Sequence, residues 1–270
     1  MQQQTKSTNS GFTLVEILII VPIVIMIIMS LIAVIIDLTG STLVSREQLV
    51  QARDTQASLD RIGQDVRLSN LYLAQNNITI SSPQGVNNTT TAFQNVGTTN
   101  GTALIIQSLT TDKNPIASDR KLIFTDRPND CGTPLVTSNN PYYVNIVYFV
   151  KDNNLYRRTL ATYNPSPRPC TTPWQLPSCA TGQMNGTTCK SEDILLATGV
   201  SNFQIEYYST ASSVSPITAA TSTSNNTTTR NNALVGASSV KVTISLEKTV
   251  AGRTINYSGT SRDSKLNSIQ

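Results

Sequence analysis

The sequence predicts an α+β protein in which a long N-terminal helix packs on the antiparallel β-sheet of a C-terminal head. Two observations support this fold class. An uncharged, largely apolar run of twenty residues, 17–36, continues into a polar segment that contains no strong helix breaker. Beyond Gln75 apolar residues instead alternate with polar ones, which is the period of half-buried strands. We therefore expect one membrane anchor followed by one exported domain.

The apolar run is long enough to cross a bilayer. Each helical residue rises about 1.5 Å, so twenty residues match a hydrocarbon core of roughly 30 Å. The run follows a short polar leader in which Lys6 is the only charged side chain. Positive charge before an anchor favours a cytoplasmic N-terminus and an exported C-terminus. An ordinary secretory signal places its apolar region before the cleavage site, whereas we expect this chain to be cut before the apolar region.

A distinctive string stands directly before the apolar run: Gly11-Phe12-Thr13-Leu14-Val15-Glu16. It resembles the class III signal of type IV pilin-like proteins. The resemblance implies that residues 1–11 are a leader, that a prepilin peptidase cleaves after Gly11, and that Phe12 is then N-methylated. It also implies that Glu16 stays in the membrane and takes part in assembly. The alternative is a plain single-pass anchor with an incidental carboxylate.

Cleavage after Gly11 would create an α-ammonium group on Phe12, and a charge beside hydrocarbon needs a partner. Glu16 can supply that partner. If subunits stack with parallel helices, Glu16 of one subunit can pair with the Phe12 amine of its neighbour. We therefore expect Glu16 to recruit the chain into a fibre in one register.

The second half of the helix is amphipathic. Apolar residues recur there at near-helical spacing: Leu59, Ile62, Val66 and Leu73. We therefore predict one helix from Phe12 to near Ala74. Its membrane half would be residues 12–36 and its amphipathic half residues 37–75. The charged residues between them are expected to form a solvated or salt-bridged face. The arginine and aspartate pattern of residues 59–68 resembles that of the W-class minor pilins and J-class minor pseudopilins.

Residues 76–270 are predicted to form a β-rich head with long loops. We expect strands at residues 103–109, 121–125, 142–150, 155–160, 240–246 and 255–261, and a strand pair or one bent strand at 194–208. Asp152 to Asn154 predict a hairpin turn. Residues 76–101 form the expected irregular connection, with a candidate edge strand at 77–81. Residues 209–232 are low in complexity and are predicted to be irregular and mobile. The order of the last strands resembles the C-terminal half of J-class and W-class proteins.

The chain contains no histidine, which excludes Ser-His-Asp and Cys-His catalysis and histidine-based zinc sites. Its four cysteines all follow the anchor: Cys131, Cys170, Cys179 and Cys189. We expect two disulfides formed in an oxidising compartment, with free buried thiols as the alternative. Three pairings are possible, among which we prefer Cys131 with Cys170 and Cys179 with Cys189.

We predict no cofactor and no metal site. Several pseudopilins bind calcium, and acidic loops lie at residues 126–130 and at Asp112 and Asp119, but these loops lack EF-hand spacing and favour turn formation instead. No pair of carboxylates is singled out for catalysis, so we expect no enzymatic activity.

The function expected from the resemblance is that of a minor pilin or minor pseudopilin that primes or caps a type IV pilus-like or type II secretion filament. Its partners would be the prepilin peptidase, other pilin or pseudopilin subunits, the inner-membrane assembly platform and, before assembly, the plasma membrane. The chain would be a single-pass protein that later enters an extracytoplasmic filament. A major pilin subunit is the first alternative.

A pilus-borne adhesin or DNA-binding module is the second alternative. Seven basic residues could contact phosphates, with Tyr156 or Trp174 stacking on bases: Lys113, Arg120, Lys121, Arg127, Arg157, Arg158 and Arg168. The formal net charge is only +4, and the positive charge of the head is diffuse, so binding of nucleic acid is not expected.

Overall fold

The computed structural model describes residues 13–78, 92–97, 102–123, 141–161, 175–183, 189 and 191–266. Several residues singled out in the sequence lie outside these ranges: Gly11, Phe12, Cys131, Cys170 and Trp174. The acidic loop at 126–130 and most of the candidate edge strand at 77–81 also lie outside them.

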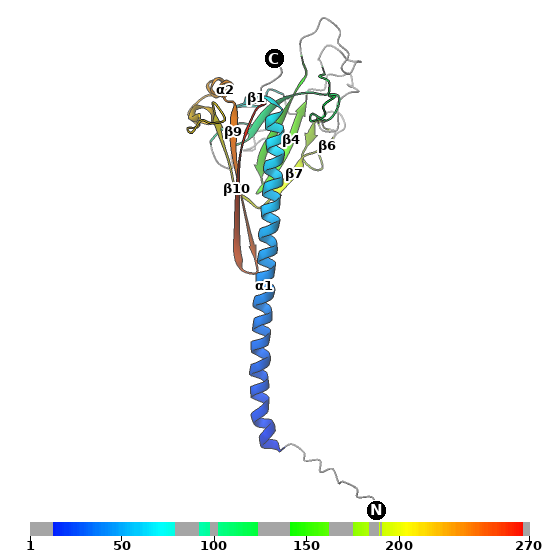
Figure 1. Cartoon of the computed structure of the whole chain (residues 1–270), viewed down its shortest axis with the longest axis vertical. Coiled ribbons are helices and arrows are strands. Elements are labelled where there is room, and N and C mark those ends of the chain that lie inside the picture. Colours follow the sequence, from blue (N-terminus) through cyan, green and yellow to red (C-terminus); the bar gives the residue numbers. More distant parts are fainter. Residues whose placement is uncertain are drawn as a thin grey trace, which may run out of the picture.

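A single helix, α1 (Leu14–Arg67), forms a long stalk, and the head packs on its C-terminal half (Figure 1). The helix continues through Pro22. Leu59, Ile62 and Val66 are buried against the head, as their spacing predicts.

The helix ends at Arg67, so the prediction that it extends to Ala74 is wrong. The Ser69 hydroxyl donates a hydrogen bond to the Val66 carbonyl, and Ser69–Leu73 form strand β1. β1 pairs with β2, placing Leu73 opposite Ile105. Leu73 has helical spacing from Val66, but the sheet supplies its backbone partners.

The first sheet has five antiparallel strands in the order β1-β2-β3-β4-β7. The strands after β1 are β2 (Leu104–Leu109), β3 (Tyr143–Lys151), β4 (Asn154–Ala161) and β7 (Ile194–Thr198). Asp152 and Asn153 have φ angles of 50° and 57° and form the predicted hairpin turn between β3 and β4. In the described part of the predicted strand at 121–125, Leu122 makes only an isolated bridge with Thr111.

The second sheet has three antiparallel strands in the order β10-β9-β8: β8 (Val200–Tyr208), β9 (Ser239–Val250) and β10 (Arg253–Ser264). The predicted strand region at 194–208 is a strand pair shared by the two sheets, because β7 belongs to the first and β8 to the second. The chain changes sheets at Gly199, whose φ is 72°. A Cβ atom there would lie 2.7 Å from the Glu247 carbonyl oxygen, so only glycine fits.

The low-complexity segment at 209–232 is more regular than expected. It contains a short 3-10 helix, η2 (Thr218–Ala220), and most of helix α2 (Thr227–Val235). Asn226 caps α2 by accepting a hydrogen bond from the Thr229 amide at 2.8 Å. Ala220 within this segment and Leu234 just beyond it are fully buried in the main core, and they anchor the polar segment to the head.

The main core lies between α1 and the two sheets. A second apolar cluster covers the other face of the five-stranded sheet, where Phe93 packs on Phe149. A small parallel pair, β5 (Ser178–Cys179) and β6 (Ser191–Glu192), lies at the side of the head.

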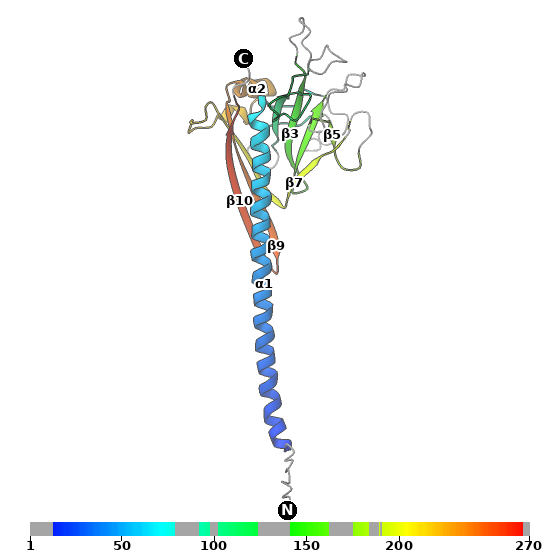
Figure 2. The same ribbon diagram turned by 45° about the vertical axis from the view of Figure 1, so that its right-hand side comes forward.

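The β9–β10 hairpin extends from the head along α1 toward the N-terminus, and both views show it beside the helix (Figure 1 and Figure 2). Gly259 allows β10 to approach the helix closely, since a Cβ atom there would lie 2.6 Å from Thr55 Cγ2. At the tip, Ala251 Cβ is 4.0 Å from where a Cβ of Gly40 would be. Lys248 pairs with Glu47 at 2.7 Å, and Arg253 Nη2 lies 3.4 Å from Asp37 Oδ1.

Candidate functional site

Residues 14–36 of α1 form a continuous, largely apolar surface that no other described part of the chain covers. Every residue from 14 to 36 is exposed, including Leu14 at 81% and Ile36 at 66%. Among the described residues, α1 is the one helix long and apolar enough to cross a membrane. A surface of this size needs an apolar environment, either lipid or other protein.

Glu16 lies in the first turn of α1 and forms a capping box with Thr13 at the N-terminus of the helix. Its Oε2 atom accepts hydrogen bonds from the Thr13 amide at 2.9 Å and the Thr13 hydroxyl at 2.8 Å. The Glu16 amide in turn donates to Thr13 Oγ1 at 3.3 Å. The Thr-x-x-Glu spacing is a sequence signal for this cap, whereas the expected partner of Glu16 was the amine of a neighbouring chain.

Beyond residue 36 the two sides of α1 differ. Between Gly40 and Thr55 the stripe of α1 under the β9–β10 hairpin is mostly small or polar, and Gln51 and Thr55 within it are buried. Neither Gln51 Oε1 nor Thr55 Oγ1 has a hydrogen-bond partner among the described residues. Exposed leucine and valine residues lie on the uncovered sides: Leu38, Leu43, Leu49 and Val50. The apolar surface therefore continues past the long apolar run.

In the head, a buried ion pair joins α1 to β4. Asp65 Oδ2 accepts a hydrogen bond from Arg157 Nε at 2.6 Å and another from the Tyr148 hydroxyl. The side chains of Arg157 and Asp65 are only 4% and 9% exposed. Burial, and then the Asp65 charge, raises the pKa of Tyr148 well above its ordinary range. The expected charged face of the helix is thus partly a buried contact.

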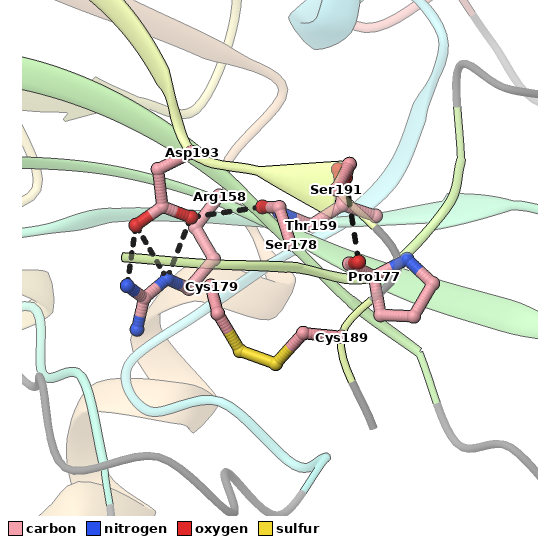
Figure 3. The surroundings of a disulfide bond; sticks show 8 residues. All are labelled: Arg158, Thr159, Pro177, Ser178, Cys179, Cys189, Ser191 and Asp193. Carbon is pink, nitrogen blue, oxygen red and sulfur yellow. Dashed lines mark hydrogen bonds and ion pairs between the residues drawn. A yellow bond between two sulfur atoms is a disulfide. The ribbon is translucent and has the colours of Figure 1, made fainter. Parts of the chain in front are cut away.

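The next residue of β4 enters a second network, because successive strand residues point to opposite faces of a sheet. Figure 3 shows Arg158 facing Asp193, with Nε–Oδ distances of 2.9 and 3.0 Å. Asp193 Oδ1 also accepts a hydrogen bond from the Ser178 hydroxyl at 2.9 Å. Arg158 in addition lies over the rings of Phe93 and Phe149, with 5.4 Å to each centroid.

A disulfide between Cys179 and Cys189 lies beside this network (Figure 3). It confirms one half of the preferred cysteine pairing. The bond ties β5 to the segment that precedes β6, and the hydrogen bond from Ser178 to Asp193 ties β5 to the residue that follows β6.

The two consecutive arginines were candidates for contacts with nucleic acid, but both are buried and paired with carboxylates. They are therefore unavailable for phosphate contacts. Lys113 pairs with Asp119. Arg127 and Arg168 lie outside the described residues.

The acidic residues at 112 and 119 serve local structure. Asp112 Oδ1 accepts a hydrogen bond from the Lys121 amide at 2.7 Å, while Asp119 pairs with Lys113. Within the described ranges, no group of three or more potential ligands among His, Cys, Asp and Glu could hold a metal ion.

Neither the scan against protein-family models nor the search of curated proteins finds a match for this chain.

Proposed function

We propose that this chain is a minor subunit of a type IV pilus-like or type II secretion-like filament. One observation carries the proposal: a long apolar helix surface starts at a capped glutamate, has no partner within the described chain, and bears an antiparallel β head at its far end. The Gly-Phe-Thr-Leu-Val-Glu string before that surface supports the same class of protein.

The apolar surface has to be covered in two states. Before assembly, residues 17–36 would cross the plasma membrane, with the head on the exported side. After cleavage behind Gly11 and methylation of Phe12, the same residues would pack among the helices of neighbouring subunits. One apolar helix suits both environments, since lipid tails and apolar side chains have similar polarity.

Glu16 would direct assembly by pairing with the Phe12 ammonium of a neighbouring subunit. Within one chain its carboxylate already accepts two hydrogen bonds from Thr13. These bonds fix the carboxylate at the start of the helix without neutralising its charge. A neighbouring ammonium group would therefore meet a positioned anion.

Two features favour a priming or capping role over that of a shaft subunit. The head after α1 is large for a subunit that must repeat densely along a fibre. The β9–β10 hairpin also occupies one side of α1 in a region where neighbouring helices would have to pack.

The test replaces Glu16 with Gln in the full-length chain in cells that assemble the filament. We expect normal processing after Gly11 but loss of the chain from the sheared-filament fraction, because the neighbouring ammonium loses its counter-charge. Glu47→Gln is the matched control, since Glu47 is a helix carboxylate that already pairs with Lys248.

Normal incorporation of a processed Glu16→Gln chain would contradict the assembly role. Immunogold labelling of sheared filaments distinguishes a subunit at the filament end from a subunit along the shaft. Label at filament ends supports priming or capping, whereas dense label along the shaft would make the chain a major subunit.

A further inference from the structure

We propose that the tip of the β9–β10 hairpin lies in the phospholipid headgroup layer on the same side of the membrane as the head. The proposal depends on the membrane insertion of residues 17–36 proposed above. It adds a second membrane contact, made by a strand turn more than two hundred residues further along the chain.

The position of the tip along α1 is the first argument. Residues 17–36 span about 30 Å as a helix, which is the thickness of the hydrocarbon core, so the core ends near Ile36. Gly40 lies four residues further, about 6 Å along the axis. The polar layers add roughly 5–8 Å on each side of the core. Because Ala251 lies against Gly40, the hairpin tip is at the depth of the headgroups.

The chemistry of the tip fits that layer. Ala251 and Gly252 are exposed and small, so the turn can lie among headgroups without inserting a long apolar side chain. Arg253 follows directly, and its side chain is 61% exposed. Its contact with Asp37 is long, at 3.4 Å, and joins two mostly exposed groups. The exposed Arg253 guanidinium can therefore bind lipid phosphate, because two of its N–H groups can donate to two phosphate oxygens at once.

Lys248 provides an internal comparison on the same hairpin. It pairs with Glu47 at 2.7 Å, and Glu47 lies eleven residues beyond Ile36. That is about 16 Å along the axis, outside the headgroup layer. Lys248 and Arg253 are both exposed cations paired with helix carboxylates, but only Arg253 is at headgroup depth.

The experiment uses the full-length chain reconstituted in vesicles of phosphatidylcholine and phosphatidylglycerol, with a quencher attached to the headgroup of a minor lipid. A fluorophore is attached either at the tip, in Ala251→Cys, or further along β10 toward the head, in Thr260→Cys. Both positions are exposed, and nine residues of strand separate them by about 30 Å. The unsubstituted chain, treated in parallel, corrects for labelling of native cysteines.

We expect quenching at residue 251 to be at least threefold stronger than at residue 260. Arg253→Gln should reduce the quenching at residue 251 about twofold, and Lys248→Gln should leave it unchanged. Equal quenching at both positions in chains that float with the vesicles would overturn the inference. Fluorescence at residue 251 that does not change when the quencher is present would also overturn it.

Vesicle flotation keeps the two proposals separate. A chain that does not float with vesicles contradicts the proposed insertion of residues 17–36 and, with it, the hairpin contact. A chain that floats but shows no preferential quenching at residue 251 contradicts only the hairpin contact.

Discussion

At the scale of single residues, Asp65 shows how a charge on a helix can belong to the core. Its spacing puts it beside the apolar stripe of Leu59, Ile62 and Val66, and it was expected on a solvated or salt-bridged face. In the structure it is buried and accepts hydrogen bonds from Arg157 and Tyr148. Local periodicity cannot identify a partner that lies 92 residues away on a strand of the head.

Asp65→Asn should destabilise the head strongly. The substitution keeps the volume but leaves the buried Arg157 charge without a counter-charge, which typically costs about 3–5 kcal/mol. Urea unfolding of the full chain in detergent, followed by tyrosine fluorescence, measures the change. Asp119→Asn is the control, because Asp119 pairs with Lys113 on the surface and should leave the midpoint unchanged. Similar midpoints for both variants would show that the buried pair contributes little.

The buried tyrosines predict a loss of stability at alkaline pH. Burial raises the pKa of Tyr148 and of Tyr207 well above the ordinary value of 10.0. Above that value the unfolded chain releases these protons while the folded chain keeps them. The contribution of these two tyrosines to the free energy of unfolding is therefore fully present below pH 10.0 and is lost as the pH rises further.

Tyr207→Phe tests this effect at one residue. The Tyr207 hydroxyl is buried and has no hydrogen-bond partner among the described residues, so its removal should cost nothing at neutral pH. Above pH 10.0 the variant should lose less stability than the wild type, because one titrating group is absent. Unfolding curves at neutral and alkaline pH measure the difference, and parallel losses in both chains would contradict it.

At the scale of elements, the contact between α1 and the β9–β10 hairpin depends on close approach as well as on apolar burial, since Ile255 of β10 is 3% exposed. The covered stripe contains the buried polar side chains of Gln51 and Thr55, and Gly259 of β10 lies directly on Thr55. Three ion pairs also join the hairpin to α1 at different positions along the helix. They are Arg253 with Asp37, Lys248 with Glu47, and Asp263 with Arg67 at 2.8 Å.

Gly259→Ala should weaken this contact, since the added methyl group would lie 2.6 Å from Thr55 Cγ2. Overpacking of this kind costs about 1–3 kcal/mol. Thr55→Ser removes the clashing methyl group and keeps the hydroxyl, so the double variant should recover most of the lost stability. Thermal unfolding of the four chains gives the coupling energy. Additive losses would show that the two residues are not in contact.

Much of the fold could be predicted because it follows from local patterns. The apolar run predicted the stalk, β-type apolar runs predicted β2, β3 and β4, and alternation predicted β8 and β9. β1 and α2 could not be predicted, since β1 continues a helical spacing and α2 lies in a polar segment anchored by Leu234. In the candidate site, the sequence located Glu16, but the partners of Asp65 and Arg158 depend on which strands become neighbours.

At the scale of the whole molecule, the chain separates two tasks along one axis. The N-terminal part of α1 offers apolar surface to its surroundings, while the C-terminal part is fastened to the head by buried charges and by β10. The head can therefore keep its own stability while the environment of the apolar part changes from lipid to protein, as the proposed function requires.

The one-sided covering of α1 has a consequence for symmetry. An open helical polymer needs two different surfaces on each subunit, one for the neighbour ahead and one for the neighbour behind. On this chain the hairpin occupies one flank of the helix beyond residue 40, and the exposed leucines lie on the uncovered sides. In the proposed filament the covered flank would be closed to a neighbouring helix beyond residue 40, so subunits on that side could pack only on residues 14–36.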